Sequence, residues 1–418
     1  MRNILLTSLL LGTLIGISAQ SQAQDSTFKV KIMQYNLLRF GNCSGVTISD
    51  KYAWLGNVMN HVRPDIMVAN ELSPSSLYAQ GIVFNSFSYS GTIDHAAFTN
   101  SRGSDIVNML FYDTEKFGLI STSILPSSNV RDINLYKLYF KPSTVGSTDT
   151  TFLYVIAAHL KASNSSSDIN QRWDAAIDIM NWIKNNAPGE NVILAGDLNI
   201  KTPSENAYSE LVNDRPVDET LVDPLDLANG WNAGIYAKYM TQSPRASSTD
   251  CGVGGGMDDR FDFVFPSQAI MDGTKGIRYE EDSYITVGND GNSRDQELAC
   301  GNNTTVPSTV CLSLRLMSDH LPVLATFDMQ GRTTRNELEQ LPYDFQFFTQ
   351  ENGWNIRARR YQGAPLTYQL VDLRGQVVQS LTTTQVDVSI RVPNLAHGVY
   401  VLRISDQTGR QTIQKLVR

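Results

Sequence analysis

The sequence predicts a four-layered α/β-sandwich, with two mixed β-sheets packed face to face between flanking helices, followed by a small C-terminal all-β sandwich. Two observations predict this fold. Short apolar runs alternate with amphipathic segments over residues 27–329. From residue 342 onward only alternating, strand-like runs follow. With 418 residues, 41% of them hydrophobic and 18% charged, the chain is globular and long enough for more than one domain.

Most of the predicted strands of the first domain have an apolar body and a polar residue at one end. They span residues 29–36, 64–71, 105–113, 151–159, 191–195, 260–265 and 321–325. Apolar runs of this length are consistent with strands buried on both faces. Because the chain leaves a sheet where its strands end, we expect the polar ends to gather at one rim of the two sheets.

Two amphipathic segments are expected to cover these sheets. Ser167 and Asp168 can cap a helix whose apolar residues recur at helical spacing and which ends at residues 185–189. Residues 52–62 predict a second helix, leading into strand 64–71. The glycine-rich residues 252–256 lack the lysine and the following helix of a phosphate-binding P-loop, so we expect a flexible loop there.

The sequence Gly196-Asp197-Leu198-Asn199 follows the apolar strand 191–195. In extended backbone, residues two apart face the same way, so the Asp197 and Asn199 side chains should emerge side by side. A carboxylate can orient or deprotonate a water, and an amide can donate to a non-bridging phosphate oxygen. The pair therefore predicts phosphoester chemistry, although the same residues also occur in turns and helix caps.

Two other strands end on residues that can hold a metal ion. Strand 29–36 ends on Asn36, and strand 64–71 ends on Glu71. A hard divalent cation takes oxygen ligands and keeps several waters, so one carboxylate helped by one amide is a sufficient protein contribution. We therefore expect Glu71 and Asn36 to bind Mg²⁺, with Mn²⁺ or Ca²⁺ as alternatives.

Two of the five histidines adjoin predicted strands. His159 ends strand 151–159, and His320 precedes strand 321–325. Near neutral pH an imidazole can donate to a phosphate oxygen or hand a proton to a leaving group. Asp262 lies among bulky apolar neighbours, where a buried carboxylate needs a partner. We expect Asp262 to orient His320, with Asp259 as the alternative.

Read in chain order, six motifs resemble the motif series of the endonuclease/exonuclease/phosphatase superfamily, over residues 28–327. They are QYNLL, VANEL, AAHLK, GDLN, RFDF and SDHLPV. Pancreatic deoxyribonuclease, abasic-site endonucleases, bacterial sphingomyelinases and inositol polyphosphate 5-phosphatases belong to this superfamily. Six motifs in the right order are far more specific than any one of them.

The resemblance implies a role for each matched residue. Asn36 and Glu71 match the metal-binding positions of the superfamily. Asp197 and Asn199 match the pair that positions the attacking water and stabilises the transition state. The implied chemistry is hydrolysis by a metal-activated water, without a covalent intermediate.

The remaining matched positions concern acid–base chemistry and subclass. His320 would be the general acid or base beside an acidic partner, and Asp319 a further metal or orienting ligand. A histidine at position 159 resembles the deoxyribonuclease and sphingomyelinase branches rather than the abasic-site branch, which has a tyrosine there. Asn108, in strand 105–113, is expected to be structural rather than catalytic.

The net charge of −8 argues against the broad basic surface that tight, sequence-independent binding of nucleic acid requires. A nuclease is still compatible with it, because metal ions and a local basic groove can serve a transiently bound substrate. Lys161, Arg172 and Lys201 lie near the predicted site in sequence and could supply that groove. Arg172 could equally be a structural ion-pair partner.

The first residues predict a secretory signal peptide, 1–23, with Arg2 before a short apolar stretch and small residues before a cleavage point after Ala23. No other segment of the mature chain has transmembrane length. Four cysteines remain, which is consistent with two disulfides outside the cytoplasm. Of the three possible pairings, the short intervening loop favours Cys300 with Cys311, leaving Cys43 with Cys251.

After residue 329 the sequence changes character. Residues 330–341 are mostly polar and predict a linker, and residues 342–418 predict a β-sandwich. The endings LAHGVYVLRI and QKLVR resemble the C-terminal sorting domain of the type IX secretion system of Bacteroidetes. The resemblance implies passage through that secretion machinery to the cell surface or the medium, and structural roles for Asp387 and His397.

Three functions fit the sequence. The first is an extracellular, monomeric nuclease acting on DNA or RNA. The second is a phosphoesterase of the same fold, such as a sphingomyelinase or an inositol phosphate phosphatase. The third is a surface-binding protein without activity. A sphingomyelinase should show an exposed apolar hairpin, for which residues 236–240 are the nearest candidate; the sequence therefore favours the nuclease.

Overall fold

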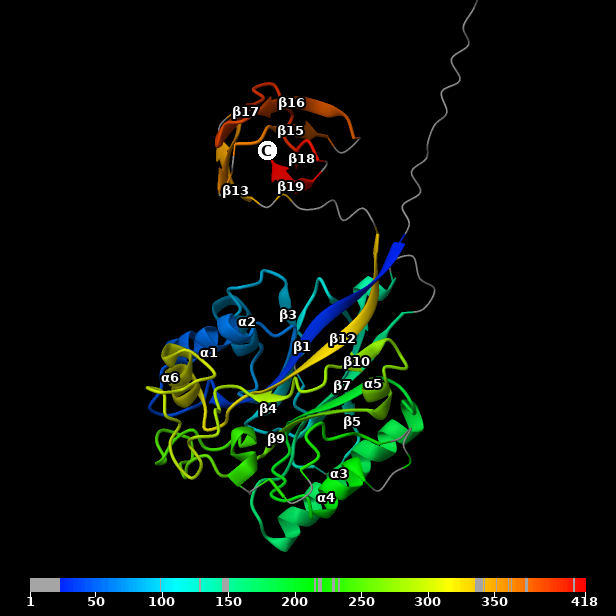
Figure 1. Ribbon diagram of the computed structural model, residues 1–418, viewed down its shortest axis with the longest axis vertical. Helices are drawn as coiled ribbons and strands as arrows, with labels where there is room; N and C mark the ends of the chain where they lie inside the picture. Colours follow the sequence, from blue (N-terminus) through cyan, green and yellow to red (C-terminus); the bar gives the residue numbers. More distant parts are fainter. Residues whose placement is uncertain are drawn as a thin grey trace, which may run out of the picture. The chain divides into compact units, whose positions relative to one another are not determined.

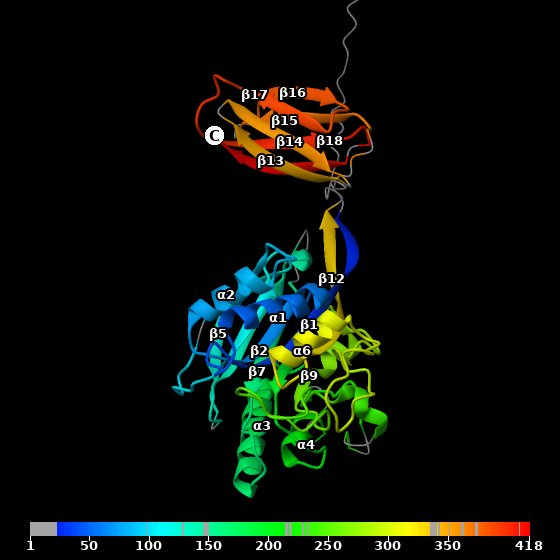
Figure 2. The same ribbon diagram turned by 90° about the vertical axis from the view of Figure 1, so that its left-hand side faces the viewer.

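The computed structural model describes residues 23–418 apart from 98, 128, 145–149, 214–215, 217–219, 228–229, 232–233, 335–340, 342, 351, 360, 362, 373–374 and 409. Residues 1–22 of the expected signal peptide lie outside the described residues. The chain divides into two compact units, Asp25–Arg332 and a second that contains Thr333–Arg418 (Figures 1 and 2).

The first unit contains two mixed β-sheets. The larger has the strand order β10-β12-β1-β2-β4-β3, with β11 paired to β12, and the smaller has the order β5-β6-β7-β8-β9. The strands of the larger sheet are β1 (Ala23–Phe40), β2 (Ile66–Leu72), β3 (Ile93–His95), β4 (Val107–Asp113), β10 (Ile277–Tyr279), β11 (Ile285–Thr286) and β12 (Val323–Thr334). Those of the smaller are β5 (Phe117–Leu125), β6 (Ile133–Phe140), β7 (Phe152–His159), β8 (Val192–Asp197) and β9 (Asp262–Pro266).

Both faces of the central strands are buried, as the apolar runs predicted. In β7, Val155 and Ala157 belong to the core between the sheets, whereas the intervening Ile156 and Ala158 belong to the core beneath the helices. Side chains of a strand alternate between its two faces, so a strand covered on both sides must be apolar throughout. This pattern makes a helix–sheet–sheet–helix sandwich, and the predicted fold class is confirmed.

Helices cover the outer faces of the two sheets (Figure 1). Those of the first unit are α1 (Ile48–Val62), α2 (Ser76–Ser86), α3 (Ser166–Asn186), α4 (Asn206–Val212), α5 (Gln268–Asp272) and α6 (Ser308–Met317), with short 3-10 turns η1 (Lys141–Thr144) and η3 (Gly234–Tyr239). No helix among the described residues is long and apolar enough to cross a membrane.

Capping side chains set two helix starts earlier than predicted. Thr47 caps α1 by accepting the Asp50 N–H, so this helix starts at Ile48 rather than at residue 52. Ser165 caps α3 in a capping box, in which Ser165 and Asp168 accept each other's backbone N–H. The expected cap at residue 167 is therefore replaced by one two residues earlier, because the Ser-x-x-Asp spacing fits position 165.

Strand β12 continues to Thr334, so the first residues of the predicted linker 330–341 extend a strand. The backbone N–H of Gln330 donates to the carbonyl of Gly276, which keeps this part in the sheet. Residues 335–340 lie outside the described residues.

The second unit is a sandwich of two antiparallel sheets, with strand orders β13-β14-β17 and β16-β15-β18-β19. Its strands are β13 (Asp344–Gln350), β14 (Gly353–Arg359), β15 (Leu366–Val371), β16 (Val377–Thr383), β17 (Asp387–Arg391), β18 (Val399–Ser405) and β19 (Gln411–Val417). Trp354, Ile356, Tyr368, Leu402 and Ile404 are among the residues of their shared core. The predicted all-β region is thus present.

Candidate active site

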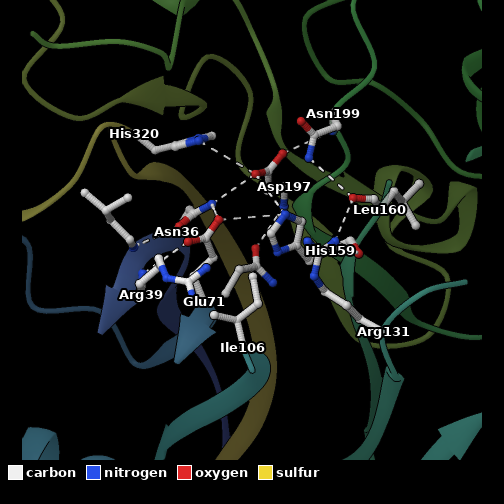
Figure 3. A network of polar contacts seen from close by, with 12 residues as sticks. Asn36, Arg39, Glu71, Ile106, Arg131, His159, Leu160, Asp197, Asn199 and His320 are labelled. Atoms are coloured by element: carbon white, nitrogen blue, oxygen red, sulfur yellow. Dashed lines mark hydrogen bonds and ion pairs between the residues drawn. The ribbon is translucent and has the colours of Figure 1, made fainter. Parts of the chain in front are cut away.

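The strand ends of both sheets converge on one cluster of polar side chains (Figure 3). In the larger sheet, the parallel strands β1 and β2 bring Asn36 beside Glu71. In the smaller sheet, His159 lies opposite Asp197 in the parallel pair β7 and β8, and Asp197 lies opposite Asp262 in the antiparallel pair β8 and β9. The predicted gathering of polar strand ends is therefore present.

Asn36 links the two sheets within this cluster. Its Nδ2 donates to Oε1 of Glu71 at 3.2 Å and to Oδ2 of Asp197 at 3.0 Å, while its Oδ1 accepts the N–H of Leu38. The amide therefore aligns the two carboxylates with its donor side, whereas a metal ligand would present its oxygen. Asn36 lies where it was predicted, but its oxygen is engaged with the backbone.

Several residues around the cluster have the left-handed backbone conformation, which residues other than glycine rarely adopt. The φ angle is positive at Leu38 (47°), Arg39 (46°), Glu71 (60°) and Asn199 (52°). Such residues persist only where the surrounding structure holds them, and they concentrate at functional sites. One contact that stabilises Glu71 in this conformation is the backbone N–H of Arg39, which donates to Oε2 of Glu71 at 3.1 Å.

The turn at Asn199 corrects one expectation. Asp197 is the last residue of β8, and the positive φ of Asn199 ends the extended backbone, so the two side chains do not emerge in parallel. Instead the Asn199 N–H donates to Oδ1 of Asp197 at 3.1 Å, and its Nδ2 donates to the carbonyl of Leu160 at 3.4 Å. Asp197 thus reaches the cluster from the end of β8, and Asn199 from the tight turn that follows it.

His159 is buried beside the two carboxylates. Its Nε2 lies 3.5 Å from Oδ2 of Asp197 and 4.0 Å from Oε1 of Glu71, while its Nδ1 has no hydrogen-bond partner among the described residues. Burial, with the nearby Arg131 and His320 cations, lowers the pKa of His159 well below its ordinary value. The ring is therefore neutral near pH 7, and its Nε2 can serve as a donor to a phosphate or as a metal ligand.

His320 is paired with Asp262. Its Nδ1 lies 2.7 Å from Oδ2 of Asp262, and its Nε2 lies 2.7 Å from Nε2 of Gln242. Asp259, the alternative partner, pairs through its backbone with Gln242 instead. Burial alone would lower the pKa of His320, but the carboxylates of Asp262 and Asp197 hold it well above its ordinary value.

Asp319 lies apart from the other carboxylates. Its Oδ2 accepts the N–H of Val253 at 2.9 Å, and the residue lines the same cleft. It belongs to neither of the two groups of ligand atoms described below. Asp319 and His320 both line this cleft.

Asp197 is a buried carboxyl with two acidic neighbours. Burial, together with Asp262 and Glu71, raises the pKa of its carboxyl to about 7, against the lowering effect of His320. An acid held near this value can exchange a proton at neutral pH, and a bound cation would lower its pKa by supplying the missing positive charge.

The donor set fits a divalent cation. The ligand atoms of Glu71, His159 and Asp197 lie within 4.8 Å of one another, as do those of Asp197, Asp262 and His320. Carboxylate oxygens suit Mg²⁺ and Mn²⁺, whereas an imidazole more often binds Zn²⁺, Fe²⁺ or Ni²⁺. The first group combines both donor types with an incompletely balanced negative charge.

The cluster lies in an open cleft of about 380 Å³. Three cationic side chains line this cleft: Arg39, Arg131 and Lys201. Arg131 donates to the carbonyl of Leu160, next to His159. Sequence reasoning missed Arg39, which directly follows the QYNLL motif, and Arg131, which lies between β5 and β6 in no motif. A larger cavity, of about 820 Å³, contains none of the predicted site residues.

The other two predicted cations have different surroundings. The buried Arg172 donates to Oε2 of Glu205 through Nε and Nη2, so it is the structural ion-pair partner that the sequence allowed. Lys161 pairs with Asp168 in the first turn of α3. Of the three, Lys201 alone lines the cleft.

Two disulfides pair all four cysteines as predicted, Cys43 with Cys251 and Cys300 with Cys311. Cys251 lines the cleft, two residues before Val253, which holds Asp319. The first disulfide therefore ties one wall of the cleft to the loop that follows β1.

Together the fold and the site define an α/β-sandwich protein with a buried carboxylate–imidazole cluster suited to a divalent cation. Structures to which the chain is similar include TDP2 from D. rerio in complex with a single-strand DNA product (16% identity, covering 72% of this chain and 98% of that one, TM-score 0.46). They also include the human Nocturnin catalytic domain with a bound sulfate anion (14% identity, covering 73% of this chain and 97% of that one, TM-score 0.46).

A third similar structure is an endonuclease/exonuclease/phosphatase family protein from Bacteroides thetaiotaomicron (14% identity, covering 73% of this chain and 97% of that one, TM-score 0.45). Its description names the superfamily that the six motifs resemble. At these identities and TM-scores, the three matches carry no assignment of function.

Residues 351–418 match the family described as "Secretion system C-terminal sorting domain". The resemblance seen in the C-terminal sequence is thereby confirmed, and it implies secretion or attachment at the cell surface. A search of curated proteins gave no significant match.

Proposed function

We propose that this protein is a secreted, Mg²⁺-dependent phosphodiesterase whose substrate is DNA or RNA. The observation that carries the proposal is the convergence of Glu71, His159, Asp197 and the Asp262–His320 pair in one cleft. The six motifs that supply these residues also resemble one superfamily of phosphoesterases. In the proposed organisation a signal peptide (1–23), a catalytic domain (27–329), a linker (330–341) and a sorting domain (342–418) follow one another.

Glu71 would hold the metal ion beside His159 and Asp197, whose candidate ligand atoms lie within 4.8 Å of its own. Asn36 aligns Glu71 and Asp197, and Asp319 is proposed as a further ligand or orienting group from the cleft wall. A bound Mg²⁺ would polarise a phosphate oxygen and offset the charge that develops on it.

The protein side chains would move the protons. Asp197 orients the attacking water and accepts its proton. His320, kept protonated by Asp262, donates to the phosphate or to the leaving oxygen. Asn199 and His159 donate to the remaining phosphate oxygens. Water attacks the phosphorus directly, so no covalent intermediate forms.

The rim of the cleft favours a nucleic acid over a lipid. Arg39, Arg131 and Lys201 can contact the phosphates on either side of the scissile one. Within the segment considered for membrane insertion, Met240 is buried and Tyr236 and Tyr239 pack against the core. That segment therefore does not offer the apolar hairpin expected of a sphingomyelinase.

The test is Mg²⁺-dependent product release from plasmid DNA, RNA, sphingomyelin and an inositol polyphosphate. Wild type, His320→Ala and the control His397→Ala, in the C-terminal domain, are compared with and without EDTA. We expect cleavage of DNA or RNA that EDTA and His320→Ala abolish and His397→Ala leaves intact. Cleavage of the lipid or the inositol phosphate alone would assign the second function, and no activity on any of the four would favour a binding protein.

A further inference from the structure

Three side-chain amides on adjacent strands of the larger sheet form a hydrogen-bonded chain beneath the catalytic cluster. They are Gln34 in β1, Asn70 in β2 and Asn108 in β4, all buried. Nε2 of Gln34 donates to Oδ1 of Asn70 at 2.9 Å, and Nδ2 of Asn70 donates to Oδ1 of Asn108 at 2.8 Å. Asn108 in turn donates to the carbonyl of Ala157 in β7, which anchors the chain in the other sheet.

The chain of amides touches the catalytic cluster at two points. The second N–H of Gln34 Nε2 donates to Oδ1 of Asp262 at 2.9 Å, while Oδ2 of Asp262 accepts from His320. Oδ1 of Asn70 also accepts the backbone N–H of Asp197 at 2.9 Å. One amide therefore fixes the partner of His320, and the next fixes the end of β8.

The chemistry of the contacts settles the orientation of the Gln34 amide. Both atoms that Nε2 faces, Oδ1 of Asn70 and Oδ1 of Asp262, are acceptors. Rotating the amide would place its oxygen against both of them. The orientation leaves Oε1 of Gln34 buried without a hydrogen-bond partner among the described residues. A buried polar atom without a hydrogen bond costs free energy. An apolar side chain at this position would fill the core without that cost, so packing alone does not explain Gln34.

We propose that Gln34 and Asn70 are positioning residues that hold the Asp262–His320 pair and Asp197 in register for catalysis. The proposal rests on the function proposed above. A carboxylate with both oxygens engaged cannot rotate, so the Gln34 donor fixes the direction in which Asp262 holds the imidazole. Oδ1 of Asn70, which accepts from both Gln34 and the backbone N–H of Asp197, fixes the position of Asp197 at the end of β8. The amides touch no substrate and act through Asp262 and Asp197.

The reach of the Gln34 side chain and its N–H donor provide a test. Gln34→Asn keeps an amide but shortens its reach toward Asp262 by one methylene, whereas Gln34→Met keeps a similar size and has no donor. We expect each variant to lower kcat about 10- to 100-fold with little change in KM. If either variant keeps the wild-type kcat, the proposal is wrong.

A spectroscopic readout keeps this test independent of any substrate. In protein labelled with ¹⁵N-histidine, the Nδ1 proton of His320 reports its hydrogen bond to Asp262 and is assigned by its absence from His320→Gln. We expect this resonance to shift in both Gln34→Asn and Gln34→Met. A loss of kcat with an unmoved resonance would refute the positioning role. If no phosphoester is cleaved at all, the resonance alone still decides this inference, while the proposed function fails separately.

Asn191 provides the matched control, since it is a buried amide outside the cluster. Its Nδ2 donates to the carbonyls of Phe152 and Lys275. Asn191→Ser should lower the melting temperature without changing kcat per folded molecule or the His320 resonance. An equal fall in kcat for Asn191→Ser would show that any buried amide matters equally, and the positioning role would be rejected.

Discussion

Nδ1 of His320 lies 2.7 Å from Oδ2 of Asp262, with both side chains buried. The hydrogen bond joins β9 of the smaller sheet to the segment that enters β12 of the larger one. It therefore couples the two sheets at the cleft. The same contact fixes the ring and raises the pKa of His320, so a single carboxylate supplies both orientation and protonation.

Replacing that carboxylate should remove acid–base catalysis while leaving the metal ligands intact. For Asp262→Asn we expect kcat to fall by about 100- to 10,000-fold, because His320 loses both its orientation and its charge partner. Steady-state kinetics on the preferred substrate measure this loss. Asp259→Asn is the control, since its side chain has no bond to His320, and should cost less than about tenfold. Equal losses in the two variants would contradict the pairing.

Glu71→Gln should weaken metal binding, because Glu71 is the proposed principal carboxylate ligand. We expect the affinity for Mn²⁺, measured by isothermal titration calorimetry, to fall at least about tenfold. The exposed pair Glu190–Lys275 lies outside the cleft, so Glu190→Gln serves as the control and should leave the affinity unchanged. An unchanged affinity in Glu71→Gln would place the metal ion elsewhere.

Lys51 should make the stability of the protein rise with pH. Its buried ammonium donates to the carbonyls of Leu37, Leu38 and Met317, and burial lowers its pKa from 10.5 to about 7. Between these values the unfolded chain binds a proton that the folded protein does not, so the unfolding free energy increases with pH. The contribution is fully present above 10.5 and is lost as the pH falls through about 7.

The measurement compares wild type with Lys51→Met in urea titrations. Between roughly pH 7.5 and 9.5 we expect wild type to gain about 2 kcal/mol of unfolding free energy relative to the variant. The comparison cancels other groups that titrate in this range. Parallel curves for the two proteins would mean that Lys51 keeps its proton throughout.

The two disulfides should stabilise the protein unequally. Cys43–Cys251 closes a sequence separation of 208 residues and Cys300–Cys311 one of 11. On the chain-entropy account, replacing both cysteines by serine should cost about 5 kcal/mol for the first and about 3 kcal/mol for the second. Only the first change should also reduce activity, because Cys251 lines the cleft. Guanidinium unfolding and kinetics of the two double variants test both statements, and the reverse order of stability loss would contradict the account.

Much of the fold followed from local patterns. The continuous apolar runs around Val192–Leu194 and Val323–Ala325 predicted strands buried on both faces, and both are strands of a sandwich. The helix ends were less accurate, because Thr47 and Ser165 caps compete with nearby residues of similar type. These are local hydrogen bonds, whose choice depends on the path by which the chain enters the helix.

The site residues at strand ends were also within reach of the sequence. Glu71, His159, Asp197 and Asp262 each stand where an apolar run meets a polar residue, and the structure brings them together. Arg131 was missed, because it lies between strands in no motif and reaches the cleft only through the folding of its loop.

The sequence by itself determined the strand pattern, the cysteine pairing that a short loop favours, and the kinds of side chain available for chemistry. Only the tertiary structure decided that Asp262 rather than Asp259 holds His320, that Asn36 turns its donor to the carboxylates, and that Gln34 and Asn70 join beneath them. The physical reason is that hydrogen bonds are directional. Periodicity predicts which face a residue takes, whereas hydrogen bonds between strands far apart in sequence depend on the register and packing of the two sheets.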